Sequence, residues 1–286
     1  MTAHVEEIRL SLPHIELAAH LSGPEDGRPV IALHGWLDNA MTFARLTPKL
    51  PGLRIVALDF AGHGYSAHRP AGAGYSLWDN ALDVLMAAEQ LGWERFSLLG
   101  HSMGAIVSVL LAAAMPERVE RLALIDGLVP FTSEAGSTAE NLGRALKAQL
   151  LLGRKRKPVY PNIERAVAAR MKDGAVSREA AELLAERGLM PVPGGYTWRT
   201  DPRLTLPSPL RFTRDGALNL LDSLRCPVSL VLTREGVLGR KSGVRDHLDG
   251  RPFAIEELPG GHHLHLDDEA GAQAVAAVIR PFLTAD

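Results

Sequence analysis

The chain lacks the features that tie a protein to an oxidising compartment or to a bilayer. Its 286 residues include one cysteine, Cys226, so an internal disulfide is excluded. No apolar run approaches the ~20 residues that cross a bilayer, and the start Met1-Thr-Ala-His-Val-Glu-Glu has no basic segment followed by an apolar one. We therefore expect a soluble cytoplasmic protein with no membrane partner, in which Cys226 has a structural role.

The chain also lacks a strong charge of either sign. Its formal net charge is -2, which gives no electrostatic reason to expect nucleic acid as a partner. The basic run Arg154-Lys-Arg-Lys157 is too small for a phosphate-binding surface, and we interpret it as a solvated face. Hydrophobic residues make up 46% of the chain and charged residues 22%, as in ordinary globular proteins with a sizeable core.

Short β-like runs alternate along much of the chain with segments of helical length. This pattern predicts an α/β fold with a mostly parallel central sheet flanked by helices on both faces. The first two strands, joined by a short turn at Pro13, are expected to form an antiparallel edge hairpin. The expected strands are Ile8–Leu12, Ile15–His20, Pro29–Leu33, Ile55–Leu58, Phe96–Leu99, Arg121–Ile125, Val228–Leu232 and Phe253–Leu258, and the expected helices are Leu77–Leu91, Ala105–Met115 and Glu269–Leu283.

The most informative motif is Gly100-His101-Ser102-Met103-Gly104, which lies between an expected strand and an expected helix. A serine hydroxyl is a poor nucleophile unless a base removes its proton, and a sharp strand-to-helix turn exposes the hydroxyl to that base. Gly100 and Gly104 would let the strand and the helix pack closely around the strained turn. The motif therefore predicts a nucleophile elbow with Ser102 as the nucleophile.

Three further motifs occur in the order typical of one family. His34-Gly35-Trp36 follows an apolar strand, Asp59-Phe-Ala-Gly-His-Gly-Tyr-Ser66 follows another, and Pro259-Gly-Gly-His-His-Leu-His-Leu266 lies near the end. With the elbow, these motifs resemble the α/β-hydrolases over almost the whole chain. The runs Leu33–Asn39 and Trp198–Leu204 look most like the serine hydrolase-like subgroup.

The alternation of strands and helices stops between Leu128 and about Pro209. Helical patterns cover 138–152 and 162–170 in this stretch, which lies where an α/β-hydrolase often inserts a cap. We expect a hydrolase core formed by residues 1–127 and 210–286, and a helical cap formed by residues 128–209.

The base is expected in a turn that contains His262, His263 and His265. His262 follows Gly261 directly, as in the Gly-His pattern of the family, so we favour His262 over His263. His265 is expected to pack against neighbouring structure. A metal site formed by the three histidines is the rival interpretation, but adjacent ligands in a tight turn point apart, so we expect no metal and no cofactor.

The resemblance implies an oxyanion hole formed by the backbone amides of Trp36 and Met103. Fixed amides stabilise the negative charge that develops in the transition state because they are aligned before the reaction begins. His34 and Asp59 match family positions that organise loops, and we interpret both as structural.

The acid departs from the commonest family pattern. Most relatives carry it in the loop after the strand that corresponds to 228–232, but here that position holds Val237. Glu235 in the same loop and Asp126 at the end of the preceding sheet strand are the two candidates. We favour Asp126 because an apolar strand would deliver it rigidly beside the elbow.

Together these residues predict a serine hydrolase that cleaves a small-molecule carboxylic ester through an acyl-enzyme, with the triad Ser102, His262 and Asp126. A thioesterase, an amidase or a hydrolase of C-C bonds would use the same groups. A non-catalytic protein that binds a small ligand under its cap is the alternative from another class, and Val237 at the usual acid position is its main support. The sequence indicates neither the oligomeric state nor the acyl and alcohol groups.

Overall fold

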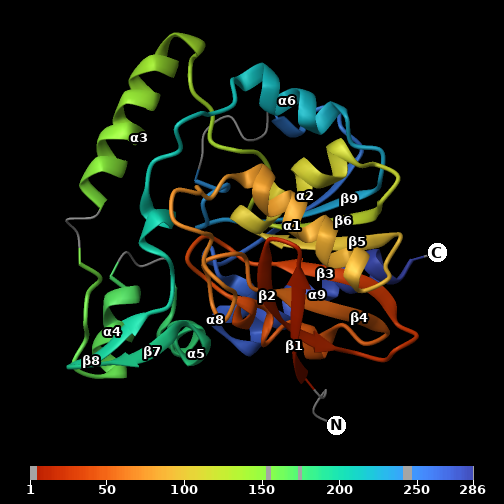
Figure 1. Ribbon diagram of the computed structural model, residues 1–286. Helices are drawn as coiled ribbons and strands as arrows, with labels where there is room; N and C mark the ends of the chain where they lie inside the picture. The colour runs from red at the N-terminus through yellow and green to blue at the C-terminus, as the bar shows by residue number, and fades with distance from the viewer. Residues whose placement is uncertain (1–4, 153–155, 173–175, 241–246, 286) are drawn as a thin grey trace.

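The computed structural model describes residues 5–152, 156–172, 176–240 and 247–285 (Figure 1). Its main sheet has eight strands in the order β1-β2-β4-β3-β5-β6-β9-β10. β1 is antiparallel to β2 and β2 is antiparallel to β4, whereas all other neighbours are parallel. The expected mostly parallel sheet and its edge hairpin are confirmed. The strands are β1 (Val5–Leu12), β2 (Ile15–Ser22), β3 (Arg28–Leu33), β4 (Leu53–Leu58), β5 (Phe96–His101), β6 (Val119–Ile125), β9 (Val228–Thr233) and β10 (Phe253–Leu258).

The central strands are buried on both faces, which explains their continuous apolar sequences. Along β3, Ile31 and Leu33 belong to one hydrophobic cluster, whereas Val30 and Ala32 belong to another on the opposite face. All four side chains are fully buried. Because side chains alternate along a strand, a run without polar residues supplies both layers of the core.

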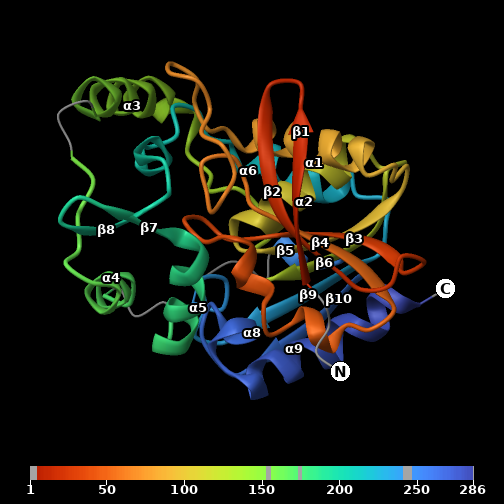
Figure 2. The same cartoon turned by 60° about the horizontal axis from the view of Figure 1, so that its bottom comes forward.

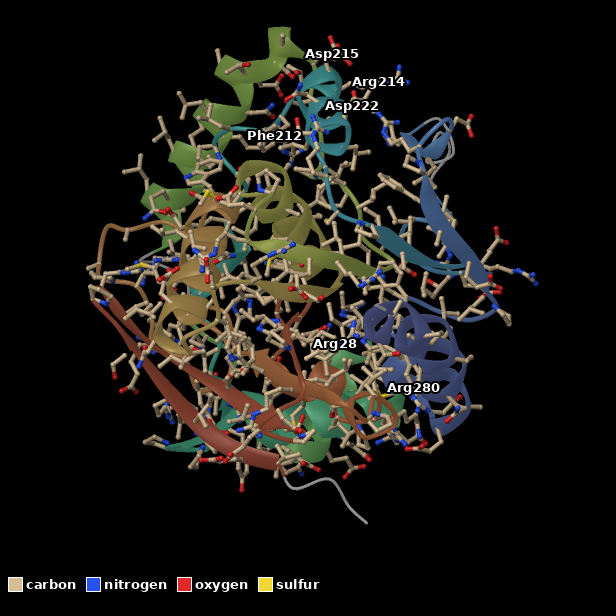
Figure 3. The ribbon with its side chains drawn as sticks, turned by 90° about the vertical axis from the view of Figure 1, so that its right-hand side faces the viewer. Arg28, Phe212, Arg214, Asp215, Asp222 and Arg280 are labelled. Carbon is tan, nitrogen blue, oxygen red and sulfur yellow. The ribbon has the colours of Figure 1, made fainter. Side chains whose placement is uncertain are left out.

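Helices cover both faces of the sheet, as Figures 2 and 3 show from two directions. The helices α1 (Leu77–Gln90), α2 (Met103–Ala114) and α6 (Arg214–Asp222) contribute to the first cluster. The helix α9 (Glu269–Thr284) lies against the second cluster, together with the 3-10 turns η1 (Ala40–Phe43) and η2 (Thr47–Lys49). In Figure 3, Arg214 and Asp222 mark α6, and Arg280 marks α9 at the other face.

The helices and the hairpin of the 128–209 segment lie to one side of this core in both ribbon views. The helices α3 (Thr138–Leu152) and α4 (Ile163–Arg170) form where the sequence predicts them. The helix α5 (Arg178–Gly188) and the hairpin of β7 (Leu189–Val192) and β8 (Gly195–Trp198) were not expected, so the segment is mixed in structure and not purely helical. Its remaining elements are η3 (Ala135–Ser137) and η4 (Pro202–Thr205). Arg154 and Lys155 of the basic run lie outside the described residues.

The structure bears on two expectations from the sequence, that no helix crosses a membrane and that Cys226 has a structural role. Among the described residues, the structure has no helix that is both long and apolar enough to cross a membrane. Cys226 is half-buried and packs against the first hydrophobic cluster. Burial raises the pKa of its thiol, which disfavours the nucleophilic thiolate.

Candidate active site

Ser102 occupies the turn between β5 and α2. Its backbone has φ 53° and ψ -114°, a conformation that costs free energy for a residue with a side chain. The Ser102 N-H donates to the carbonyl of Ile125 at 3.0 Å, and α2 begins at the next residue. The sequence prediction of a strained strand-to-helix turn agrees with this geometry.

Two glycines allow the close packing around this turn. A Cβ on Gly104 would lie 1.9 Å from the carbonyl oxygen of Leu33, and a Cβ on Gly100 would lie 2.4 Å from the Cα of Ala105. Both distances are far below van der Waals contact with backbone atoms that cannot rotate away. Any larger residue would therefore push α2 away from β3 or β5.

The structure brings His262 to Ser102 across 160 residues of sequence. The Nε2 atom of His262 lies 2.9 Å from the Oγ atom of Ser102, and its Nδ1 atom lies 2.5 Å from Oδ2 of Asp126. In the tautomer that carries the proton on Nδ1, the imidazole donates to the carboxylate and accepts from the hydroxyl. Ser102, His262 and Asp126 thus form a continuous hydrogen-bonded chain.

Asp126 follows β6 directly and is held by the loop after β9. Its carboxylate accepts from the backbone N-H groups of Val237 at 2.7 Å and Leu238 at 3.2 Å. A Cβ on Gly236 would lie 2.2 Å from Oδ2 of Asp126, so only glycine lets the loop come this close. Val237, at the position where the family resemblance led us to look for the acid, donates its backbone N-H to Asp126, which follows the neighbouring strand. The sequence reasoning missed this role of Gly236 and Val237.

The other candidate acid does not contact the imidazole in this structure. Oε2 of Glu235 accepts from the Gly260 N-H at 2.7 Å, and the Glu235 N-H donates to the Gly260 carbonyl at 3.0 Å. Both bonds tie the loop after β9 to the turn that carries His262. Glu235 therefore orders the turn from outside, whereas Asp126 lies against the ring.

The two amides expected for the oxyanion hole belong to the elements that flank Ser102. Met103 is the first residue of α2, and N-H groups in the first turn of a helix have no acceptor within the helix. Trp36 lies in the loop after β3, where the next residue, Leu37, has φ 62° and donates its N-H to Nε2 of His63 at 3.2 Å. The Trp36 indole N-H donates to the Leu204 carbonyl at 2.9 Å, which ties this loop to η4.

His34 and Asp59 lie in the loops beside the site and are fully buried. His34 accepts from the Phe60 N-H at 3.0 Å and lies 2.7 Å from the Gly35 carbonyl, to which its Nδ1-H donates. Burial lowers the pKa of His34, which keeps the ring neutral in this arrangement. Asp59 accepts from the N-H groups of Ala40 and Tyr65 at 2.7 Å each. These contacts join loops to one another, as the structural interpretation of both residues requires.

The other histidines of the turn face away from Ser102. Nε2 of His263 lies 3.0 Å from Oδ2 of Asp38, so its bonding partner is a second buried carboxylate. His265 is fully buried, and neither ring nitrogen has a hydrogen-bond partner among the described residues. Burial lowers the pKa of His265 to about 3, so the ring packs as a neutral group. Of the three, His262 alone lies beside the nucleophile.

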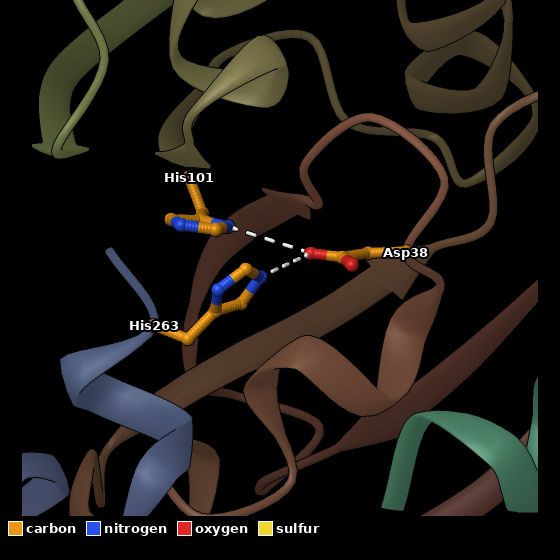
Figure 4. Close-up of side chains that lie close together, drawn as sticks. All are labelled: Asp38, His101 and His263. Carbon is orange, nitrogen blue, oxygen red and sulfur yellow. Dashed lines mark hydrogen bonds and ion pairs between the residues drawn. The ribbon is translucent and has the colours of Figure 1, made fainter. Parts of the chain in front are cut away.

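Asp38, His101 and His263 form a buried cluster (Figure 4). One ligand atom from each residue lies within 4.8 Å of the others, a spacing that would suit a metal ion. However, Oδ1 of Asp38 lies 2.5 Å from the Arg170 guanidinium and Oδ2 accepts from His263. A cation would compete with both donors, so the residues fit a hydrogen-bond network better. The set differs from His262, His263 and His265, the group considered from the sequence.

Charge balance explains why a carboxylate is tolerated at this depth. Burial raises the pKa of Asp38, but His263 and Arg170 outweigh it and hold the pKa well below its usual range. His101 donates its Nε2-H to the carbonyl of His262 at 2.9 Å. Burial and the neighbouring histidines lower the pKa of His101 well below its usual value. Asp38 and Arg170 were missed from the sequence, because 132 residues separate them and no spacing rule connects them.

Known proteins share this architecture over nearly the whole chain. A family model described as the alpha/beta hydrolase fold matches residues 28–161. A serine hydrolase-like protein from Danio rerio is 32% identical over 99% of this chain and 90% of its own length, and serine hydrolase-like protein 2 from Homo sapiens is 31% identical over 98% and 94%. The crystal structure of a hypothetical protein from Pseudomonas aeruginosa PAO1 is 72% identical, with a TM-score of 0.95 over 97% of this chain and 99% of that one. The chain therefore belongs to the α/β-hydrolase family and is similar over its length to serine hydrolase-like proteins of that family.

Proposed function

We propose that the protein is a serine hydrolase that cleaves a carboxylic ester through an acyl-enzyme. The observation that carries the proposal is the continuous chain from Ser102 Oγ through the His262 ring to the Asp126 carboxylate, with distances of 2.9 and 2.5 Å. Nucleophile, base and orienting acid are the three groups that acyl transfer requires. The serine hydrolase-like relatives support the same class of reaction.

In the proposed reaction, Oγ of Ser102 attacks the ester carbonyl while Nε2 of His262 takes the hydroxyl proton. The amides of Met103 and Trp36 bind the oxyanion of the tetrahedral intermediate. Asp126 holds the Nδ1-H and stabilises the imidazolium, which then protonates the leaving alcohol. A water molecule, deprotonated by His262, hydrolyses the acyl-enzyme and restores Ser102.

Two alternatives are weighed against this proposal. Aspartate nucleophiles, which haloalkane dehalogenases and epoxide hydrolases of this family use, are excluded because residue 102 is serine. The non-catalytic alternative depended on Val237 at the usual acid position. Two contacts argue against the non-catalytic alternative: Asp126 contacts His262, and the Val237 N-H donates to the Asp126 carboxylate.

The test of this function uses a fluorophosphonate probe and esters of graded length. An activated serine attacks phosphorus, so the probe is expected to label Ser102, as peptide mass spectrometry would show. Ser102→Ala should lose both the label and hydrolysis of p-nitrophenyl esters, whereas Ser108→Ala, a buried serine of α2, should keep both. Labelling that persists in Ser102→Ala would place the nucleophile elsewhere.

A further inference from the structure

The turn that carries His262 is packed against the 128–209 segment as well as the sheet. It continues into the short helix α8 (Leu264–Asp267), whose Leu266 is fully buried. Leu266 belongs to the same hydrophobic cluster as residues of α4 and α5, which we call the α4–α5 cluster. Its members are Ala166, Val167, Val176, Ala180, Ala181, Leu184, Ala185, Leu189 and Leu266.

Hydrogen bonds join the same two parts of the chain. Ser177, the N-cap of α5, donates its backbone N-H to Oδ1 of Asp267 at 2.9 Å and its hydroxyl to the Asp267 carbonyl at 3.3 Å. The end of α8 is thus fixed to the start of α5. The 176–188 region supports the catalytic turn directly, through both apolar packing and polar contacts.

A second connection to this turn runs from Arg170 through Asp38 to His263, and Figure 4 shows its contact between Asp38 and His263. Arg170, the last residue of α4, binds Oδ1 of Asp38 at 2.5 Å, and Oδ2 of Asp38 binds Nε2 of His263 at 3.0 Å. His263 is the residue directly after His262. The Arg170 guanidinium is therefore linked to the backbone of the catalytic histidine by one carboxylate and one imidazole.

His101, which packs against His263, also contacts His262. The Nε2-H of His101 donates to the His262 carbonyl, and the rings of His101 and His263 have centroids 4.9 Å apart. His101 directly precedes Ser102, so the nucleophile and the base share a buried partner. A shift of His263 would change the peptide group that His101 holds.

The helix α3 belongs to the same segment but contacts the catalytic turn in none of these ways. Asn141 and Ala145 are its buried residues, whereas Leu146 is 57% exposed and Leu150 is 81% exposed. The segment therefore has a well-packed half, formed by α4 and α5, and a loosely held half at α3.

We propose that Arg170 is a positioning residue for His262, which it orients from outside the core through Asp38 and His263. The inference rests on the proposed function, because it assigns a role to His262 as the base. Without the guanidinium, the buried Asp38 carboxylate loses the cation bound to its Oδ1 atom and is expected to rearrange toward His263 and His101. The imidazole of His262 then moves away from Ser102, and a misplacement of about 1 Å is enough to slow acyl transfer by roughly 100-fold.

Substitutions on one helix separate positioning from general stability. Arg170→Gln should lower kcat by roughly 10- to 100-fold with KM nearly unchanged, since the residue touches no substrate. Arg170→Lys retains the charge and should recover much of this loss. Arg165→Gln is the matched control, because Arg165 is an exposed residue of the same helix and should keep full activity. Unchanged kcat in Arg170→Gln, or a change confined to KM, would overturn the proposal.

A double-mutant cycle tests whether the effect passes through His263. If Arg170 and His263 act on one path, Arg170→Gln combined with His263→Gln should lose no more kcat than the stronger single variant. Losses that multiply would show independent roles and overturn the proposal.

A measurement without substrate separates this inference from the proposed function. The His262 Nδ1 proton bonded to Asp126 should give a downfield proton NMR resonance that disappears in Asp126→Asn. We expect Arg170→Gln to shift or broaden this resonance while Arg165→Gln leaves it in place. An unshifted resonance in Arg170→Gln would overturn the positioning role, even if the wild type proved to hydrolyse no ester. If His263→Gln does not fold and the double-mutant cycle cannot be completed, the resonance of Arg170→Gln alone decides whether Arg170 positions His262.

Discussion

At the scale of single residues, the site depends on which of its charged groups contact one another. Asp126 is buried, accepts two backbone N-H groups and contacts the His262 ring, whereas Glu235 bonds the backbone of Gly260. Backbone donors hold a carboxylate in one orientation without the freedom that side-chain donors would have. Asp126 is thus presented to the ring in a fixed position by two elements at once.

The two carboxylates should respond differently to replacement by their amide isosteres. Asp126→Asn removes the acceptor that fixes the tautomer of His262, so kcat should fall by about 10⁴-fold while the fold remains intact. Glu235→Gln retains an oxygen that accepts from Gly260 and should change kcat by less than about 3-fold. Ester hydrolysis by the two purified variants checks both values. A collapse of kcat in Glu235→Gln alone would reassign the acid to the later loop.

His265 should make the protein less stable in acid. Burial lowers its pKa from 6.5 to about 3 in the folded state, so between these values the unfolded chain binds a proton that the folded protein does not. The free energy of unfolding therefore falls as pH falls through this range. His265→Met removes the group, and the slope of stability against pH should decrease by up to about 1.4 kcal/mol per pH unit. Urea unfolding at several pH values would measure it, and equal slopes in both proteins would contradict the assignment.

At the scale of elements, the contact between α2 and the strands is the most restrictive in the core. Ser102 is the single residue between β5 and α2, and the strand and the helix can pack this closely only because Gly100 and Gly104 have no side chains. Gly104 lies over the carbonyl of Leu33, so α2 approaches β3 as closely as a helix backbone can. The geometry of the elbow therefore depends on Gly100 and Gly104 as well as on Ser102.

Two helical glycines provide a direct comparison of this constraint. Gly104→Ala should destabilise the protein by about 1–3 kcal/mol or more, because its Cβ would overlap the Leu33 carbonyl. Gly143→Ala in α3 meets no atom within 4 Å and should stabilise the protein by about 0.5–1 kcal/mol, through the higher helix propensity of alanine. Thermal unfolding of both variants measures the two changes in stability, which are expected to have opposite signs. If Gly104→Ala proved neutral, α2 would be more loosely packed than described.

At the scale of the whole molecule, the core and the 128–209 segment differ in how they are built. The core is an eight-stranded sheet between two hydrophobic clusters, whereas the segment has the α4–α5 cluster and the exposed helix α3. We propose that this segment acts as a cap that covers the site. In that case α3 would contact the part of the substrate that differs between esters, such as the acyl chain. The helices α4 and α5 would hold the turn that carries His262.

The proposed cap predicts a change in substrate preference. Leu142 lies on the side of α3 next to the buried Ala145, and Leu151, nine residues later, lies on the opposite side. Leu142→Ala should change the ratio of kcat/KM between long-chain and short-chain esters, without changing the pH profile. Leu151→Ala is the control, since it removes a similar exposed side chain from the other side. Equal effects of Leu142→Ala on all esters would indicate a folding defect.

Much of the core could be predicted from the sequence because its strands are buried on both faces. A run such as 30–33 has no polar residue, and this pattern needs no tertiary information. The hairpin β7–β8 was missed because its strands have four residues each and one contains Pro191. α5 was missed because its charged residues obscure the apolar face.

The site residues that the sequence predicts and those that it misses differ in how local their sequence signals are. Ser102 and His262 lie in short motifs whose spacing is local, and Asp126 ends a strand next to the elbow. The role of Arg170 depends on a contact with Asp38, and the role of Gly236 on a close approach to Asp126. Such contacts arise only when distant segments fold together, and no pattern in one sequence encodes them.

The support of Asp126 by the loop after β9 places different requirements on neighbouring residues of that loop. β6 and β9 are adjacent parallel strands, so the acid that follows one strand and the loop that follows the other lie at the same edge of the sheet. The loop holds the carboxylate through the backbone N-H groups of Val237 and Leu238, which every residue except proline would also carry. Gly236 has no such freedom, because a Cβ there would lie 2.2 Å from Oδ2 of Asp126. The orientation of the base is therefore sensitive to residue 236 and tolerant of the side chain at residue 237.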